Sequence, residues 1–213
     1  MSAAPWTLGL CLGLAAPAMA QDSAASEALF NKGVAEMEAG KYASACPALA
    51  ESHRLDPRAG TMFALAECEA KWGKLASSVA HYSDYVGLVS LMTPADKTRH
   101  AARAKTAEKQ MSALRPQVPQ LTLVLPANAP PGTVVKRDGL ELSGVSLGTA
   151  LPVDPGEHVI VTQVPSAPEH EQKVTIAVGE RKRLELKIEL PKADAATTPA
   201  DATVYIAGFL NRL

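Results

Sequence analysis

The chain repeats a pattern of residues over positions 29–89. The dipeptide Gly40-Lys41 recurs as Gly73-Lys74, 33 residues later, and at the same offset Leu29-Phe30 corresponds to Met62-Phe63. A repeat of about 34 residues is the period of a helix–turn–helix array. The repetition therefore predicts two pairs of helices in this stretch.

Signals for helix ends divide each copy into two helices. Asp22 or Ser23 can cap the first helix, and Gly40 can end it, because glycine readily adopts the left-handed conformation found at helix ends. Pro57 stops the second helix, since the residue before it, Asp56, is disfavoured in helical geometry. The second copy has the same layout, with Gly73 at the end of its first helix.

The small residues of the first copy fall on positions that carry a family resemblance. With the closing proline aligned, Gly33, Ala45 and Leu49 occupy the small, small and large packing positions of a tetratricopeptide repeat, and the stretch resembles that family. In the second copy Ala66 replaces the glycine, Ser78 replaces the alanine, and no proline closes the repeat. The resemblance implies an array of helix pairs that binds other proteins.

A further helix is predicted after the second copy. Thr93 fits its N-cap, Pro94 its first position and Asp96 its positive end, and it should run to about Leu114. Its apolar residues form a narrow seam for docking on the second repeat: Ala104, Ala107, Met111 and Leu114. Its other faces carry mostly cations, namely Lys97, Arg99, Arg103, Lys105 and Lys109 against Asp96 and Glu108. This basic run is either a solvated face or a surface for an acidic partner.

Two cysteines fall on neighbouring predicted helices. Cys46 lies on the second helix of the first copy, and Cys68 lies on the first helix of the second copy. A disulfide requires Cα atoms within about 7 Å of each other, which adjacent helices allow. Two interpretations stay open: a disulfide between Cys46 and Cys68, or two small buried thiols.

The N-terminal residues 1–20 have the layout of a secretory signal peptide. Residues 8–16 are apolar, and Ala18-Met19-Ala20 places small residues at positions −3 and −1 of a cleavage site between Ala20 and Gln21. The apolar run is shorter than the ~20 residues that a membrane-spanning helix needs. We therefore expect export to the periplasm or cell envelope, with no transmembrane span in the mature chain.

Near residue 118 the periodicity changes from helical to alternating. Leu121, Leu123 and Leu125 alternate with other residues, and Asp138-Gly139 is a typical hairpin turn. Further strands are expected over residues 133–137, 158–164, 172–178 and 181–190, the last two joined as a hairpin through Gly179-Glu180. Several short strands with regular turns predict a small antiparallel β-sandwich.

The turns of this second half resemble those of a PEGA-type domain. They are Pro130-Pro131-Gly132-Thr133, Asp138-Gly139, Gly148-Thr149 with Pro152, and Asp154-Pro155-Gly156-Glu157-His158. A proline stands where the family motif has glutamate, and a threonine where it has alanine. The resemblance implies an envelope module that binds a surface or a polymer. Helical repeats joined to such a domain behind a signal peptide are similar to exported proteins of myxobacteria.

The sequence contains no motif typical of catalysis, metal binding or cofactor binding. Its histidines are isolated from one another: His53, His81, His100, His158 and His170. Glu169-His170-Glu171 is a dense group of metal-ligating residues, but three adjacent side chains cannot all point at one ion. The chain lacks His-Glu-x-x-His, Gly-x-Ser-x-Gly and a Walker-type loop. Its net charge of −1 does not favour nucleic acid.

These features predict an α+β protein of two domains. The predicted parts are a helical array with a capping helix over residues 24–115, an antiparallel β-sandwich over residues 120–191, and a linker with a short apolar tail over residues 192–213. The expected function is non-enzymatic scaffolding, with no cofactor. A partner protein of the envelope would lie in a groove lined by residues on the first helix of each copy: Asn31, Lys32, Glu36, Glu67 and Lys71.

Two other functions remain as alternatives. The β-sandwich would bind cell-wall material or polysaccharide in the first, although residues 121–190 contain no Phe, Tyr or Trp to stack on sugars. The second is an enzyme whose site assembles from residues far apart in the sequence. A pocket that gathers His, Asp and Ser would favour it.

Overall fold

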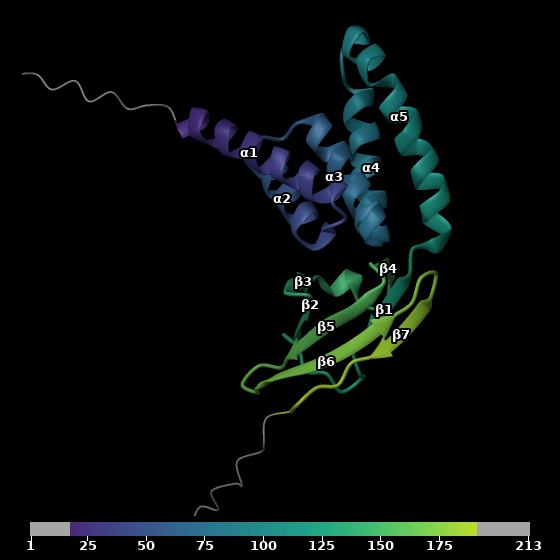
Figure 1. The fold of residues 1–213 in the computed structure, drawn as a ribbon. Helices are drawn as coiled ribbons and strands as arrows, with labels where there is room; N and C mark the ends of the chain where they lie inside the picture. Colours follow the sequence, from purple (N-terminus) through teal and green to yellow (C-terminus); the bar gives the residue numbers. More distant parts are fainter. Residues whose placement is uncertain (1–17, 191–213) are drawn as a thin grey trace, which may run out of the picture. The chain divides into compact units, whose positions relative to one another are not determined.

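The computed structural model describes residues 18–190, in which five α-helices precede seven strands (Figure 1). The chain is therefore an α+β protein, as predicted. Most of the predicted signal peptide, with Cys11, and the predicted tail lie outside the described residues. No helix within residues 18–190 is long and apolar enough to cross a membrane.

The helices form two antiparallel pairs and a fifth helix. α1 (Ala18–Glu38) packs on α2 (Tyr42–Leu55), α3 (Ala59–Trp72) packs on α4 (Leu75–Ser90), and α5 (Pro94–Leu114) packs on α4. The prediction that Asp22 or Ser23 caps the first helix is wrong, because α1 already begins at Ala18. Alanine and methionine, which precede these two residues, have high helix propensity.

The two glycines at the repeat offset end the first helix of each pair. Gly40 has φ +73° and Gly73 has φ +83°, the left-handed conformation that glycine adopts without a steric penalty. Lys41 N then donates to Glu36 O over 2.8 Å, and Lys74 N donates to Glu69 O over 2.9 Å. Both predicted helix ends are confirmed, and both use the same hydrogen-bond pattern.

Close contact between the helices of a pair depends on small residues. A Cβ atom on Gly33 would lie 2.7 Å from Leu49 Cγ and 3.1 Å from the carbonyl oxygen of Ala45, so only glycine fits there without displacement. At the equivalent place in the second pair, the buried Ser78 hydroxyl donates to Ala66 O over 2.9 Å. In each pair the two helices therefore lie close together. A missing side chain allows this in the first pair, and a hydrogen bond from a side chain to the backbone holds it in the second.

A disulfide joins the two helix pairs. Cys46 on α2 and Cys68 on α3 have an S–S distance of 2.06 Å and a Cα–Cα distance of 5.6 Å. Both lie in a buried cluster with Ala45, Leu49 and Leu65. The bridge therefore crosses the boundary between the repeats inside the apolar core.

The fifth helix begins and packs as its sequence predicts. Thr93 Oγ1 accepts a hydrogen bond from Asp96 N over 3.3 Å, and Pro94 is the first helical residue. Ala107 and Met111 are buried in one cluster with residues of α3 and α4, including Phe63. Helix α5 thus covers apolar surface that two helix pairs alone would leave exposed.

Seven strands form two sheets in the second half of the described chain. They are β1 (Gln120–Val124), β2 (Val134–Arg137), β3 (Leu140–Leu142), β4 (Ala150–Pro152), β5 (Gly156–Gln163), β6 (Glu169–Ile176) and β7 (Arg181–Glu185). One sheet has the order β4-β1-β7 and the other β3-β2-β5-β6. The pairs β1–β4, β2–β3 and β2–β5 are antiparallel.

The predicted hairpin of the last two strands is wrong, because β6 and β7 belong to different sheets. The predicted last strand is also too long, since β7 ends at Glu185. Backbone hydrogen bonds hold the chain beside β1 instead: Gln120 N donates to Glu180 O and Leu186 N to Val124 O, both over 2.8 Å. After β7, Lys187 O accepts a hydrogen bond from the side-chain hydroxyl of Thr162 on β5.

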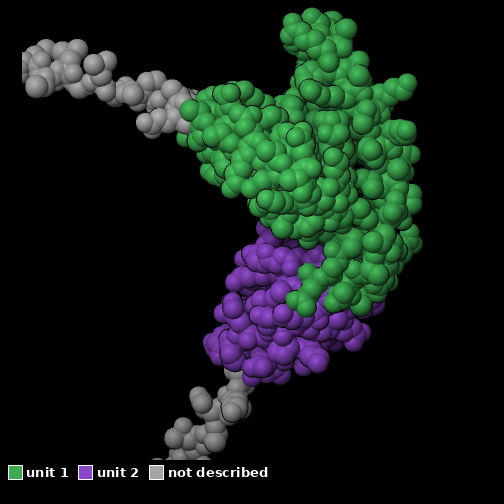
Figure 2. Space-filling view, in the orientation of Figure 1, with its two compact units in different colours: residues 1–122, 150–157, 175–182 green, residues 123–149, 158–174, 183–213 purple. Residues whose placement is uncertain are grey.

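The contacts divide the chain into two compact units, coloured green and purple in Figure 2. Of the described residues, the first unit contains 18–122, with all five helices, and also 150–157 and 175–182. The second contains 123–149, 158–174 and 183–190. Within the first unit, Asp154 accepts hydrogen bonds from Ala76 N, Ser77 N and Ser77 Oγ over 2.8, 3.1 and 2.7 Å. Asp154 thereby caps α4. The predicted bounds of the two domains stay predictions.

Replacing Gly33 with alanine should destabilise the protein. The added methyl group must displace Leu49 or the α2 backbone, which we expect to lower the free energy of unfolding by about 1–3 kcal/mol. Gly87→Ala is the matched control in α4, because a Cβ atom there meets nothing within 4 Å. Gly87→Ala should stabilise the helix by about 0.5–1 kcal/mol. Urea unfolding measures both, and equal effects of the two substitutions would contradict the role assigned to Gly33.

The chain from Gln21 onward should contain no free thiol before reduction. Thiol titration of this chain, unfolded without reductant, tests for the Cys46–Cys68 bridge, and two titratable thiols would rule it out. Replacing both cysteines with serine should lower the free energy of unfolding by about 3 kcal/mol, because the unfolded chain loses a cross-link. The same substitutions should destabilise the already reduced protein less, because only the cost of burying two serine hydroxyls in this cluster remains.

Candidate functional site

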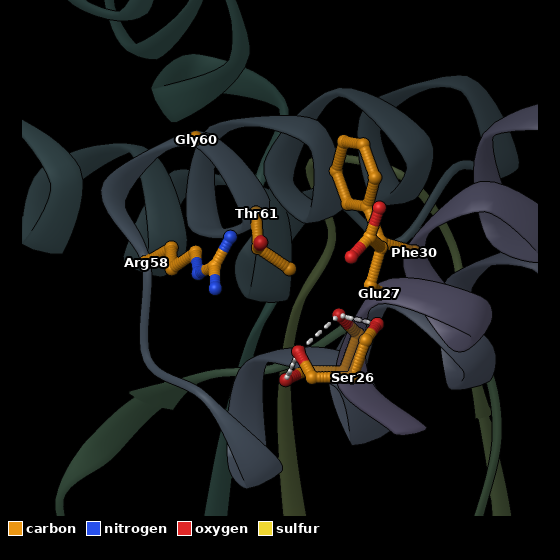
Figure 3. Close-up of a pocket in the computed structure, with 7 residues that line it drawn as sticks. Ser26, Glu27, Phe30, Arg58, Gly60 and Thr61 are labelled. Carbon is orange, nitrogen blue, oxygen red and sulfur yellow. Dashed lines mark hydrogen bonds between the residues drawn. The ribbon is translucent and has the colours of Figure 1, made fainter. Parts of the chain in front are cut away.

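A pocket opens between α1, the end of α2 and the start of α3. Its volume is about 220 Å³, and its walls come from three helices and the α2–α3 connection (Figure 3). The residues that line it are Ser26, Glu27, Phe30, Ser52, Arg58, Gly60 and Thr61. All seven belong to the first compact unit.

Two buried serines form one wall of the pocket and hold α1 against α2. The Ser26 hydroxyl donates to Ser52 O over 2.9 Å, and the Ser52 hydroxyl donates to Ser26 O over 2.8 Å. Their Oγ atoms are 3.1 Å apart. Since each hydroxyl already donates to a backbone carbonyl, these serines act mainly as a structural link.

The start of α3 presents backbone donors at the pocket. Arg58 is the N-cap residue, with φ −112° and ψ 139°, and its side chain makes no capping hydrogen bond. The first intrahelical hydrogen bond runs from Met62 N to Arg58 O over 3.1 Å. The N–H groups of Ala59, Gly60 and Thr61 therefore have no partner within the helix. These groups make the helix start favourable for negative charge.

Two side chains of opposite charge face the pocket. Figure 3 shows the Arg58 guanidinium and the Glu27 carboxylate on opposite sides, with Thr61 between them. Arg58 pairs with Asp56, through Nε at 2.7 Å and Nη2 at 2.6 Å, and remains 60% exposed. Phe30 adds an apolar wall, because it packs on the cluster around the disulfide. The pocket thus combines an apolar surface with separated charges.

The residues predicted to line a groove do not line this pocket. Asn31, Lys32 and Lys71 are exposed, whereas Glu36 and Glu67 are half-buried. Within α3, burial raises the pKa of Glu67, and the charges of Lys71 and the α5 residue Arg103 oppose that rise. The structure thus brings Glu67 and Lys71 near Arg103. Among the described residues, no hydrogen bond or ion pair connects Glu67 or Lys71 with the predicted groove residues of α1.

The pocket-forming residues of the α2–α3 connection are not among those predicted from the sequence. A local signal for this feature was present: after Pro57, the helix begins with Arg58 where Ser, Thr, Asp or Asn would normally cap it. Gly60 follows in the first turn, and a Cβ atom there would meet nothing within 4 Å. A missing cap and a missing side chain together leave room at this helix start.

Imidazole and carboxylate groups gather at a second place, on α2, α3 and α4. The buried Glu69 carboxylate lies 2.7 Å from His81 Nδ1, and this hydrogen bond raises the pKa of His81. Burial, and then the charge of His81, lower the pKa of His53. The group also includes Ser77 and Asp154. Ser77 donates its hydroxyl hydrogen bond to Asp154, so among the described residues it is not placed as a nucleophile activated by a histidine.

No group of three or more metal-ligating side chains within residues 18–190 is arranged to hold a metal ion. Glu169 and His170 of the predicted polar loop lie instead on strand β6. Lys136 pairs with Glu169 over 3.3 Å, and Glu189 lies 3.4 Å from His170. Glu169 therefore pairs with a cation, and His170 lies beside a carboxylate.

Comparisons with known proteins do not place the chain in a family. No family model matches it, and no curated protein matches it. The resemblances to tetratricopeptide repeats and PEGA-type domains therefore stay predictions.

The His81–Glu69 pair should make stability depend on pH. Because the pKa of His81 is raised above 6.5 in the folded state, its contribution is fully present below pH 6.5 and is lost as the pH rises through the folded pKa. In a His53→Gln background, His81→Gln should destabilise the protein more at pH 5.5 than at pH 8.5. Urea unfolding at both pH values measures the difference. Adding Glu69→Gln should remove most of this pH dependence. If the pH dependence stays the same, the His81–Glu69 pair is not its source.

Proposed function

We propose that the protein is a non-enzymatic scaffold of the periplasm or cell envelope. Its helical repeats bind a partner protein, and its β-strand half docks to another envelope component. The proposal draws on the predicted signal peptide and on the arrangement of α1–α4 as two helix pairs with α5 as a cover. Stacked helix pairs of this kind offer extended binding surfaces.

The observation that carries the proposal is the charged face shared by α3 and α5. Arg103 of α5 lies with its guanidinium carbon 5.9 Å from the ring centroid of Phe63 on α3. The charges of Arg103 and Lys71 both act on the half-buried Glu67. A partly desolvated carboxylate beside two cations, one of them an arginine, is a feature of protein–protein interfaces, where arginine is enriched.

The mixed charge of this face favours a partner with both acidic and basic side chains. Lys71 is exposed and free to pair with a partner carboxylate. The Glu67 carboxylate can pair with a cation of the partner, and this pairing would offset the cost of burying its negative charge. A peptide or helix carrying alternating charges would satisfy both.

Reversing the charges on this face should abolish binding of the partner. The chain from Gln21 onward is crosslinked in an envelope extract, and captured proteins are quantified by mass spectrometry. We expect Lys71→Glu with Arg103→Glu to reduce capture of the main partner at least tenfold, because a surface of the wrong sign repels it. Lys97→Glu with Lys105→Glu is the matched control, since both side chains are exposed elsewhere on α5.

Two outcomes would contradict this proposal. One is equal capture by both double variants and the unaltered chain, with unchanged melting temperatures. The other is retention of the chain by purified cell-wall polysaccharide without any protein partner, which would support the alternative function of the β-strand half. Lys71→Glu alone serves as a second variant if Arg103→Glu disturbs the packing on Phe63.

A further inference from the structure

The pocket at the start of α3 is lined by a threonine that is almost fully buried. Thr61 is only 5% exposed, and its side chain lines the pocket. Its hydroxyl makes no hydrogen bond with any other residue that the structure describes. In Figure 3 the Thr61 side chain lies between the Arg58 guanidinium and the Glu27 carboxylate. Among the described side chains, the atoms fully buried without a partner are Glu36 Oε2 and His53 Nδ1. The Thr61 hydroxyl instead reaches the pocket space, where a ligand oxygen can accept its hydrogen bond.

The neighbouring donors are also available. The N–H groups of Gly60 and Thr61 have no partner within α3. Arg58 uses Nε and Nη2 on Asp56, and Nη2 also lies 3.4 Å from Ser23 Oγ, which leaves Nη1 without a partner among the described residues. Backbone N–H groups, a hydroxyl and a guanidinium together match the oxygens of a carboxylate.

The rest of the pocket restricts which anion fits. Glu27 lines the same space on the side opposite Arg58 and repels negative charge, which restricts the ligand to a single carboxylate on the Arg58 side. Phe30 offers an apolar surface. The volume of about 220 Å³ is below the range of about 300–1,000 Å³ that is usual for drug-sized ligands. The occupant is therefore about the size of one amino-acid residue.

We infer that this pocket binds a monocarboxylate with a small apolar body. Its carboxylate lies on the N–H groups of Gly60 and Thr61, the Thr61 hydroxyl and Arg58, and its apolar part lies against Phe30. A free small acid and the C-terminal residue of a polypeptide present the same chemistry. The inference does not depend on the charged face of α3 and α5, which uses other residues.

The test uses amide NMR shifts of the chain from Gln21 onward as the readout. N-acetyl-leucine represents a C-terminal residue, leucine represents a free amino acid, and N-acetyl-leucinamide is the neutral control. We expect N-acetyl-leucine to shift the amide signals of Gly60 and Thr61 in a saturable manner, and N-acetyl-leucinamide to bind at least tenfold more weakly. Tighter binding of leucine would identify a free amino acid as the source. N-acetyl-glutamate should bind more weakly because it carries a second negative charge.

Substitutions then locate the site. Gly60→Leu should abolish binding by filling the pocket, and it should fold, because a Cβ atom there meets nothing within 4 Å. Thr61→Val and Arg58→Gln should each weaken binding at least threefold. Arg54→Gln is the control, since Arg54 is exposed at the end of α2, pairs with Glu51 and does not line the pocket. Absence of saturable shifts, equal binding of the neutral amide, or full binding by Gly60→Leu would overturn the inference.

Discussion

The spacing between α1 and α2 depends on the absence of a side chain at Gly33. Leu49 and the carbonyl of Ala45 occupy the space where a Cβ atom would be, so the two helices meet almost backbone to backbone. The second pair achieves a similar contact with a hydrogen bond from Ser78 to Ala66 O. Leu49 and Ala45 belong to the same buried cluster as the disulfide between α2 and α3. The close contact at Gly33 therefore lies next to that bridge.

Local sequence signals were sufficient to predict most of the helical half. Gly40 and Gly73 end helices because few other residues tolerate positive φ. Thr93 and Pro94 start α5 because the cap and the fixed φ of proline act within one turn. The strand half was harder to predict. The chain after Gly179 can pair with the preceding strand or with β1, and only long-range packing decides between them.

The candidate pocket was not predictable by the same reasoning. The predicted groove residues, such as Lys32 and Lys71, were chosen for their position on the first helices. The pocket instead arises where three helices and a connection leave space, and its donors include backbone groups that a sequence does not distinguish. The lack of a capping side chain at Arg58 was visible, but its meaning depends on Phe30 and Thr61 lying beside it.

Asp154 links stretches that the periodicity of the sequence would assign to different modules. Its carboxylate accepts from the first turn of α4, 77 and 78 positions earlier in the chain. An engineered truncation at the change of periodicity near residue 118 would deprive that helix of its cap, even though every helical residue would be retained. Swapping the strand half between related proteins would therefore require an acidic or hydroxyl-bearing residue at the same turn.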